Sequence, residues 1–359
     1  MEIESQVVHY TSNGQGAPTS KTERQSPLLF LNIFFLIIGC CGMPLLLRLY
    51  FLHGGHLIWF STFLQTAAFP LLLPPLLIPN SKKFKLFSLR TPHLLLSCTA
   101  LGLLTGLVNL FYAYGLSYVP VSTSSLLLST QLSFTALFSF LIVKQRFTPF
   151  SINAVVLLTV GAVVLGINSA GDRPEGVNQS KYYFGFAMTI GAAVLDGLLP
   201  TLSELMYMKA KQPVTYTVVL ETQVVMGFFA TVFCAVGMLV NHEFQAISRE
   251  AEQYALGETN YYLVIIFFAV VMQCFFLGRV GVVLYSSALL TGIIVDVLLP
   301  VTVVLAVIFF KEPFTRDKAV ALALSMWGFV SYIYGDMKDL KKRKKSTVTM
   351  KPAVEVLEN

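Results

Sequence analysis

Four acidic residues lie inside long apolar stretches of this sequence, where a charged side chain is costly to keep. They are Asp196, Glu204, Glu221 and Asp296. An ionisable group at the depth of a lipid bilayer costs at least about 2.5 kcal/mol, so one that is retained is a candidate for function. A carboxyl group in apolar surroundings can also take up a proton near neutral pH. These acids therefore suggest that protons bind and leave within the membrane.

The two aspartates share a local pattern, because a proline follows each of them four residues later, at Pro200 and Pro300. Proline has no N–H, so the carbonyl of the aspartate loses its usual helical partner. An acid and a free carbonyl then face the same region, which would suit a solute or a proton. The alternative is a helix kink that neighbouring Ser or Thr side chains satisfy. Glu204 could likewise approach Glu221 or pair with a nearby lysine.

A second group of polar and aromatic side chains at helix depth could recognise an uncharged planar ring. An amide side chain presents a donor and an acceptor together, which matches the edge of a nitrogen heterocycle, and aromatic faces can stack on it. The candidates are Gln131, Asn109, Gln65, Ser124, Ser125, Ser129, Trp59, Tyr112 and Tyr114, together with Asp296. Gln131 is the strongest of them. Serines could instead join helices, and Trp59 could belong to the interfacial aromatic belt.

Ten apolar runs must position these residues, and each is about as long as the roughly 20 residues that cross a bilayer. They span residues 28–50, 57–78, 94–114, 122–143, 150–168, 183–207, 214–240, 261–280, 285–310 and 317–335. Hydrophobic residues make up 55% of the chain and charged residues 12%, whereas soluble domains carry about 25% charged residues. We therefore predict an all-α integral membrane protein with ten transmembrane helices.

Basic residues predict the orientation, because short cytoplasmic loops are rich in Lys and Arg. With the N-terminus inside, 18 of the 25 Lys and Arg residues, Arg279 among them, fall on the cytoplasmic side and 7 on the outer side. The KKRKK cluster at 341–345 is typical of a topology determinant and could also contact anionic lipid. Both termini are thus predicted to be cytoplasmic. The net charge of +6 needs no nucleic-acid partner.

The two halves of the chain match when the sequence is shifted by 167 positions. The matched pairs are Tyr118 and Tyr285, Lys144 and Lys311, Phe147 and Phe314, Thr148 and Thr315, Ala154 and Ala321, and Gly161 and Gly328. Each half would hold five helices, and an odd number places the second copy upside down. Such a 5+5 inverted repeat is typical of secondary transporters, which bind their substrate near the midplane.

This organisation divides the chain into five parts. We expect a disordered cytoplasmic tail at 1–27, a first repeat at 28–168, a connecting loop at 169–182, a second repeat at 183–336 and a basic cytoplasmic tail at 337–359. The composition of both tails, polar and without apolar runs, predicts disorder at 1–27 and from Ser346 onwards.

The sequence lacks the motifs of several other membrane protein classes. It contains no phosphate-binding loop, no potassium-type selectivity filter and no zinc-protease or nucleophile motif. We expect no cofactor, no metal and no enzymatic activity. The sequence then favours gradient-driven transport of a small solute, with a non-transporting scaffold or a lipid scramblase as a remote alternative. The oligomeric state is not indicated.

The same residues resemble the plant purine permease family of the drug/metabolite transporter superfamily. The similar stretches run from the first helix to the last: LYFLHGGHLIWFSTFLQTAAFP at 49–70, FYAYGLSYVPVSTSSLLLSTQLSF at 111–134, SELMYMKAKQPVTYTVVLETQ at 203–223, LLPVTVVLAVIFFKEPF at 298–314 and ALALSMWGFVSYIYGD at 321–336. The resemblance implies the 5+5 fold and proton-coupled uptake of adenine, cytokinins such as trans-zeatin and related heterocycles, most simply at the plasma membrane. Some similar family members carry alkaloids, which is the alternative.

Two positions depart from the family pattern. Gln65 stands where many members have Glu, and Val303 stands where Glu commonly follows Pro-Val-Thr. Both changes remove an acid and leave the identity of the proton carrier open, and Asp196 or Asp296 could take over that role. Two acids at the midplane would also suit a protonated amine, which favours the alkaloid alternative.

We predict that amide substitutions of the four buried acids do not behave alike. One of Asp196→Asn, Asp296→Asn, Glu204→Gln and Glu221→Gln should abolish accumulation against a gradient while sparing counterflow exchange, because exchange proceeds without net proton release. Glu221, which lies near the cytoplasmic side, is the first choice and Asp296 the second. The measurement is substrate uptake into vesicles as a function of pH. Uptake that stays pH-dependent in all four variants would show that the proton is carried elsewhere.

Overall fold

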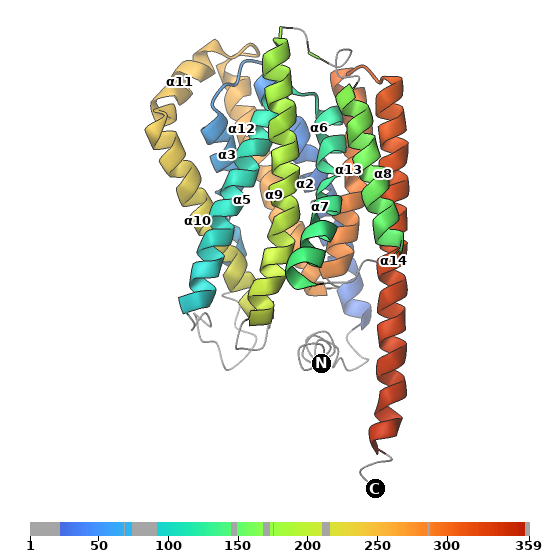
Figure 1. Cartoon of the computed structure of the whole chain (residues 1–359). Helices are drawn as coiled ribbons and strands as arrows, with labels where there is room; N and C mark the ends of the chain where they lie inside the picture. The colour runs from blue at the N-terminus through green and yellow to red at the C-terminus, as the bar shows by residue number, and fades with distance from the viewer. Residues whose placement is uncertain are drawn as a thin grey trace.

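The computed structural model describes residues 22–67, 69–73, 92–144, 149–167, 173–174, 176–209, 216–285 and 288–355. These residues form a helical bundle without strands, which confirms the all-α prediction for this part of the chain (Figure 1). The helices are α2 (Thr22–Leu52), α3 (Ile58–Thr66), η1 (Phe69–Leu72), α5 (Pro92–Tyr118), α6 (Val121–Leu128), α7 (Gln131–Phe138), the π-helix η2 (Ser139–Val143), α8 (Pro149–Ile167), α9 (Gln179–Lys209), α10 (Tyr216–Val240), α11 (Glu243–Gln253), α12 (Glu258–Tyr285), α13 (Ala288–Phe310) and α14 (Arg316–Glu355).

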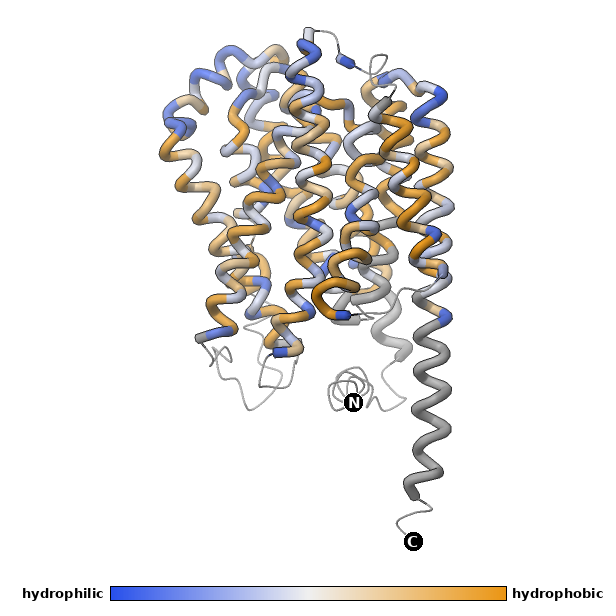
Figure 2. Tube along the Cα trace, in the orientation of Figure 1, coloured by the Kyte–Doolittle hydropathy of each residue, from blue (hydrophilic) through white to orange (hydrophobic). Residues whose placement is uncertain are grey.

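Apolar residues cover most of the bundle's length, and hydrophilic residues gather at its upper end, above all on α11 (Figure 2). Seven segments of the described chain are long and apolar enough to cross a membrane: Leu28–Leu52, His93–Tyr118, Val121–Val143, Pro149–Gly166, Gln179–Lys209, Val218–Val240 and Glu258–Arg279. Ile58–Leu72 and Val297–Phe310 are shorter apolar segments. The length and composition of these helices confirm the prediction of an integral membrane protein.

Two of the apolar runs are interrupted rather than continuous helices. α3 ends at Thr66 and η1 begins at Phe69, just before Pro70. α6 ends at Leu128, and the hydroxyls of Ser129 and Thr130 then donate to carbonyls three residues earlier, at 2.6 and 2.7 Å. Such back-bonding competes with the helical ladder and bends the chain. Broken helices let backbone groups face the inside of a membrane protein.

The chain beyond the last apolar run differs from its prediction. Composition predicts disorder from Ser346, whereas α14 continues to Glu355 and extends below the bundle (Figure 1). Lys and Arg are good helix formers, and extending an existing helix avoids the cost of nucleation. At the other end, α2 begins at Thr22, so it includes part of the predicted 1–27 tail; residues 1–21 lie outside the described part.

Helices pair closely where glycine removes a side chain from the contact. A Cβ added at Gly278 of α12 would lie 2.4 Å from the backbone nitrogen of Leu36 in α2, and one added at Gly39 of α2 would lie 2.4 Å from Cα of Phe275. Between α5 and α9, a Cβ at Gly115 would lie 2.2 Å from the hydroxyl of Thr189. Close backbone approach of this kind is how helices associate in membranes. It fixes the positions of α2, α5, α9 and α12 around the interior.

Helix boundaries coincide under the 167-residue shift that matches the two halves of the sequence. The coinciding boundaries are the ends of α5 and α12 at Tyr118 and Tyr285, the starts of α6 and α13 at Val121 and Ala288, the ends of η2 and α13 at Val143 and Phe310, and the starts of α8 and α14 at Pro149 and Arg316. The matched Lys144 and Lys311 also both have left-handed backbone angles, with φ of 58° and 50°.

We predict that Gly278→Ala destabilises the bundle, because the new methyl group would force α2 and α12 apart. Overpacking of this kind costs about 1–3 kcal/mol. The check is the melting temperature of the purified protein in detergent, which should fall. Gly166→Ala is the matched control, since a Cβ there would lie in ordinary contact, 3.5 Å from Cζ of Phe186. An unchanged melting temperature for Gly278→Ala would contradict the close packing.

Candidate substrate site

The antiparallel contact between α5 and α9 brings two of the sequence candidates to the same level. Gly115 lies against Thr189, and Phe111 lies against Gly191, where a Cβ would be 2.9 Å from the Phe111 ring. This register places Asn109 of α5 at the level of residues 193–195 of α9, next to Asp196. Both side chains are partly buried. The register therefore brings an amide and an acid to one depth of the bundle.

Gln131 joins this level from the opposite side of α9. A Cβ at Gly197, the residue after Asp196, would lie 2.7 Å from the backbone oxygen of Gln131 and 2.7 Å from Cβ of Phe134. α7 and α9 therefore touch directly beside Asp196. The side-chain oxygen Oε1 of Gln131 is buried and accepts no hydrogen bond from the described residues. A buried acceptor without a donor is costly in a native protein, which makes this atom a candidate for ligand binding.

The serines of α6 fall into two groups. Ser124, seven residues before Gln131 and about two helical turns away, is fully buried, and its hydroxyl has no partner among the described residues. Ser125 is also buried. Ser129 instead donates to the carbonyl of Leu126 and lies 3.3 Å from the hydroxyl of Ser325 on α14. Ser129 thus joins helices, which is the alternative that the sequence left open for these serines.

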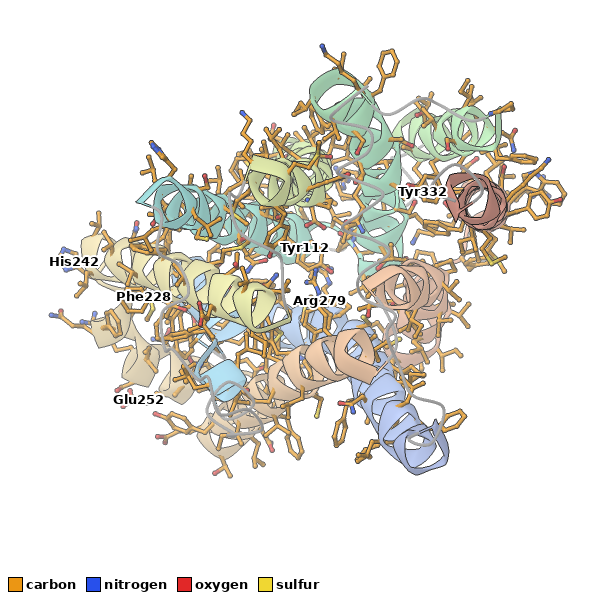
Figure 3. All side chains as sticks on the ribbon, turned by 90° about the horizontal axis from the view of Figure 1, so that it is seen from below. Tyr112, Phe228, His242, Glu252, Arg279 and Tyr332 are labelled. Atoms are coloured by element: carbon orange, nitrogen blue, oxygen red, sulfur yellow. The ribbon has the colours of Figure 1, made fainter. Side chains whose placement is uncertain are left out.

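Arg279 is a member of this region that the sequence prediction missed. It follows Met272 by seven residues and Phe268 by eleven, so all three lie on one face of α12. Phe268 and Met272 are buried in a core that includes Tyr112, yet Arg279 is exposed. The exposure of Arg279 shows that solvent reaches the lower end of this face of α12. Seen from below, Arg279 and Tyr112 lie near the centre of the projection, whereas His242 and Glu252 lie at its edge (Figure 3).

Arg279 also faces the acid of the candidate site. Its guanidinium interacts electrostatically with the carboxylate of Asp196. Side chains tilt toward the N-terminus of their helix, and α12 runs downward, so the Arg279 side chain is directed up toward the level of Asp196. The sequence analysis counted Arg279 only as a cytoplasmic topology residue. α12 continues to Tyr285, beyond the apolar run that ends at residue 280, so Arg279 lies inside the helix and not in a loop.

The aromatic candidates make packing contacts. Trp59 of α3 stacks against Phe233 of α10, with ring centres 5.5 Å apart. Tyr114 of α5 meets Phe184 of α9 edge to face at 5.8 Å. Tyr112 is 6% exposed and belongs to the central core. Gln65 is 1% exposed, and its amide nitrogen lies 3.4 Å from the carbonyl of Ser61.

The two glutamates lie on helices that meet near the lower face. Thr222 of α10 hydrogen-bonds with Tyr207 of α9 and with Cys98 of α5. Glu221 precedes Thr222 and is 6% exposed, and Glu204 lies three residues before Tyr207 and is partly buried. The neighbouring helices thus come together close to both acids. The side chain of Asp296 lies outside the described residues, although its backbone belongs to α13.

Comparison with known proteins identifies the family. The model of a family described as "Purine nucleobase transmembrane transport" matches residues 27–342. The chain belongs to this family. Purine permeases are transporters and not enzymes, as the sequence motifs predicted.

Curated relatives cover nearly the whole chain. Purine permease 2 of Arabidopsis thaliana is 48% identical over 336 residues, which are 88% of this chain and 94% of the relative. Purine permease 3 of the same plant is 46% identical over 326 residues, or 89% and 93% of the two chains. A solved crystal structure covers 86% of this chain and 96% of its own at 15% identity and a TM-score of 0.50, which indicates a shared fold alone.

We predict that Gln131→Ala raises the half-saturation concentration for substrate by about ten- to hundredfold, because a lost hydrogen bond that leaves its partner unsatisfied costs about 1–3 kcal/mol. Surface expression should be unchanged. Gln245→Ala is the matched control, since Gln245 is an exposed amide on α11. Uptake kinetics at several substrate concentrations provide the measurement. Native affinity in a well-expressed Gln131→Ala protein would assign Gln131 to helix packing.

Proposed function

We propose that this protein imports purine bases and cytokinins of the adenine and trans-zeatin type, driven by the proton gradient. Membership of the purine nucleobase transport family supports the substrate class. The observation that carries the proposal is a set of polar atoms with open bonding capacity inside an apolar bundle. Gln131 Oε1 and Ser124 Oγ are buried without partners among the described residues. Asp196 precedes Gly197, which contacts Gln131, and its carboxylate is within electrostatic range of Arg279.

The proposed architecture is a ten-helix 5+5 inverted repeat made of residues 28–168 and 183–336. The boundaries shared under the 167-residue shift, together with the paired left-handed lysines, support it. α2 begins and α14 ends at the lower face (Figure 1), as an even number of crossings requires. We place that face in the cytoplasm of a cell whose plasma membrane holds the protein, on the distribution of basic residues.

The polar groups suit a neutral purine with an exocyclic amino group. Gln131 Oε1 and the Asp196 carboxylate can each accept an N–H from that group or from the ring. The Arg279 guanidinium can donate to ring nitrogens, as Arg, Gln and Asn side chains do when they read purine edges in nucleic acids. Trans-zeatin keeps one N–H on its exocyclic nitrogen, so the same acceptor would serve adenine and a cytokinin.

Arg279 also bears on the alkaloid alternative. A protonated amine would need an unpaired carboxylate, whereas Asp196 already interacts with a guanidinium. A cationic substrate would therefore meet the repulsion of Arg279 before it could pair with Asp196. This electrostatic argument favours a neutral heterocycle over a cationic alkaloid as the substrate.

The first choice for the proton carrier is an acid apart from the ring-binding groups. Glu221 is buried in α10 near the lower face, so a proton bound there could leave to the cytoplasm when that side opens. Asp296 is the second choice, and Glu204 and Asp196 complete the set. A neutral substrate would leave the chosen acid free to bind and release its proton in each cycle.

Uptake of labelled adenine and trans-zeatin by purified protein in vesicles tests this function. With an acidic outside, both compounds should accumulate above their equilibrium level, and a protonophore should abolish the accumulation. A scaffold would show no uptake, and a scramblase would move lipid without taking up either compound. Equal uptake with and without the pH gradient would contradict proton coupling.

Arg279→Ala provides the test of recognition in the same vesicles. We expect the half-saturation concentration for adenine to rise at least about tenfold, in line with the loss of a hydrogen bond from a charged donor. Uptake of a cationic alkaloid should increase, because the repulsion is removed. Arg249→Ala, at an exposed arginine of α11, should change neither. Unchanged adenine affinity in Arg279→Ala would remove Arg279 from the site.

A further inference from the structure

Helix α11 carries two buried acids on one face at the upper end of the bundle. Glu243 and Glu250 are seven residues apart, about two helical turns, and each is 8% exposed. Glu252 of the same helix is exposed. α11 has a polar composition and lies over the upper ends of α3, α10 and α12 (Figure 1). Its two inward acids therefore have a role inside the protein rather than in water.

Glu250 binds the link between α2 and α3. One carboxylate oxygen accepts the backbone N–H groups of His56 and Leu57, at 2.7 and 3.0 Å. The other accepts the hydroxyls of Tyr50 on α2 and Tyr261 on α12, the latter at 2.9 Å. One side chain thus holds together the end of α2, the start of α3 and the start of α12.

Glu243 binds the first turn of α3. Its two oxygens accept the N–H groups of Trp59 at 3.2 Å and Phe60 at 2.7 Å. The residue that precedes α3, Leu57, makes no side-chain capping bond. Free N–H groups at a helix start attract negative charge, both by hydrogen bonding and through the helix dipole. The start of α3 is therefore capped by carboxylates that lie about 190 residues later in the chain.

The start of α6 is also capped by a carboxylate from a distant part of the chain. Glu312, in the link between α13 and α14, accepts the N–H groups of Val121 at 2.9 Å and Ser122 at 3.0 Å, and also the Ser122 hydroxyl. The fully buried Lys318 donates to the Ser122 hydroxyl at 2.8 Å. α3 and α6 are the two short, interrupted helices of the first half. Both are held at their upper ends by carboxylates of the second half.

We propose that Glu243, Glu250 and Glu312 form a carboxylate clasp that closes the outer gate of the transporter. The clasp joins the two halves of the chain at the upper face, while exposed Arg279 indicates that the lower half is open to solvent. To open the upper face, the starts of α3 and α6 must move away from α11 and from the link between α13 and α14, and the six N–H hydrogen bonds of the clasp must break. The assignment of the upper face to the outside rests on the orientation given under the proposed function. The clasp itself involves no substrate contact.

Cysteine labelling tests the clasp without any substrate. The five native cysteines (Cys40, Cys41, Cys98, Cys234 and Cys274) are first replaced. A reporter cysteine is then placed at Ser61, which lies in α3 just below the clasp and is 2% exposed. A membrane-impermeant maleimide is added from outside. In Glu250→Ala, Glu243→Ala or the double variant, the labelling rate should rise at least about tenfold, since hydrogen bonds to a charged group are lost. Glu252→Ala is the matched control and should leave the rate unchanged.

A second reporter separates gate opening from unfolding. A cysteine at position 279 faces the lower half of the interior, and its labelling from the cytoplasmic side should fall in the clasp variants if the protein shifts from inward-open to outward-open. Unfolding would raise the labelling of both reporters. Where the alanine variants unfold, Glu243→Gln and Glu250→Gln take their place, because each keeps one acceptor oxygen. They should give a smaller rise in labelling at position 61 and a smaller fall in labelling at position 279.

Three results would overturn the proposal. One is an unchanged rate at position 61 in a folded Glu243→Ala, Glu250→Ala double variant. Another is a higher labelling rate at position 61 without a lower labelling rate at position 279 in folded protein. The third is labelling of position 61 from the cytoplasmic side, which would place the clasp on the inner face. None of these results depends on whether the substrate is a purine, so failure of the clasp and failure of the proposed function are distinguishable.

Discussion

Backbone N–H and C=O groups inside a membrane must find partners within the protein, because the hydrocarbon offers none. The interrupted helices of this bundle expose such groups at their ends, and residues from distant parts of the chain satisfy them. Glu243 and Glu250 cap α3, and Glu312 caps α6. Arg48, buried in α2, donates to the carbonyls of Leu116 and Ser117 at the end of α5, at 2.6 and 3.4 Å. These contacts fix the upper ends of the helices that surround the interior.

A few buried polar atoms of the bundle do not find a partner within the described part of the protein. The buried oxygens of Gln131 and Ser124 have no partner among the described residues, although both lie in a region where other hydroxyls bond to carbonyls one turn away. A membrane protein keeps an unsatisfied polar atom at this depth only when something else compensates for it. A polar solute that passes through the bundle can do so. The orphan oxygens and the broken helices are therefore the features that support the proposed transport path.

Charged groups inside the bundle also need compensation from other groups of the protein. Asp196 interacts with Arg279, which reaches up from the lower part of α12. Each group lowers the cost of keeping the other in the interior, and together they present a donor and an acceptor to a heterocycle without a net charge.

Local patterns in the sequence determined the class of protein and most of its helices. Apolar runs of membrane length and the basic residues beside them are read from neighbouring residues, and the acids at 196, 204, 221 and 296 are conspicuous because they interrupt such runs. The sequence could not reveal the partner of Asp196, the breaks in two of the runs or the capping role of Glu243, Glu250 and Glu312. The partner of Asp196 and the capping roles depend on contacts between residues 80 to 200 positions apart. Glu250 looks like an ordinary surface acid in the sequence, and only the tertiary structure buries it against the free amides at the start of α3.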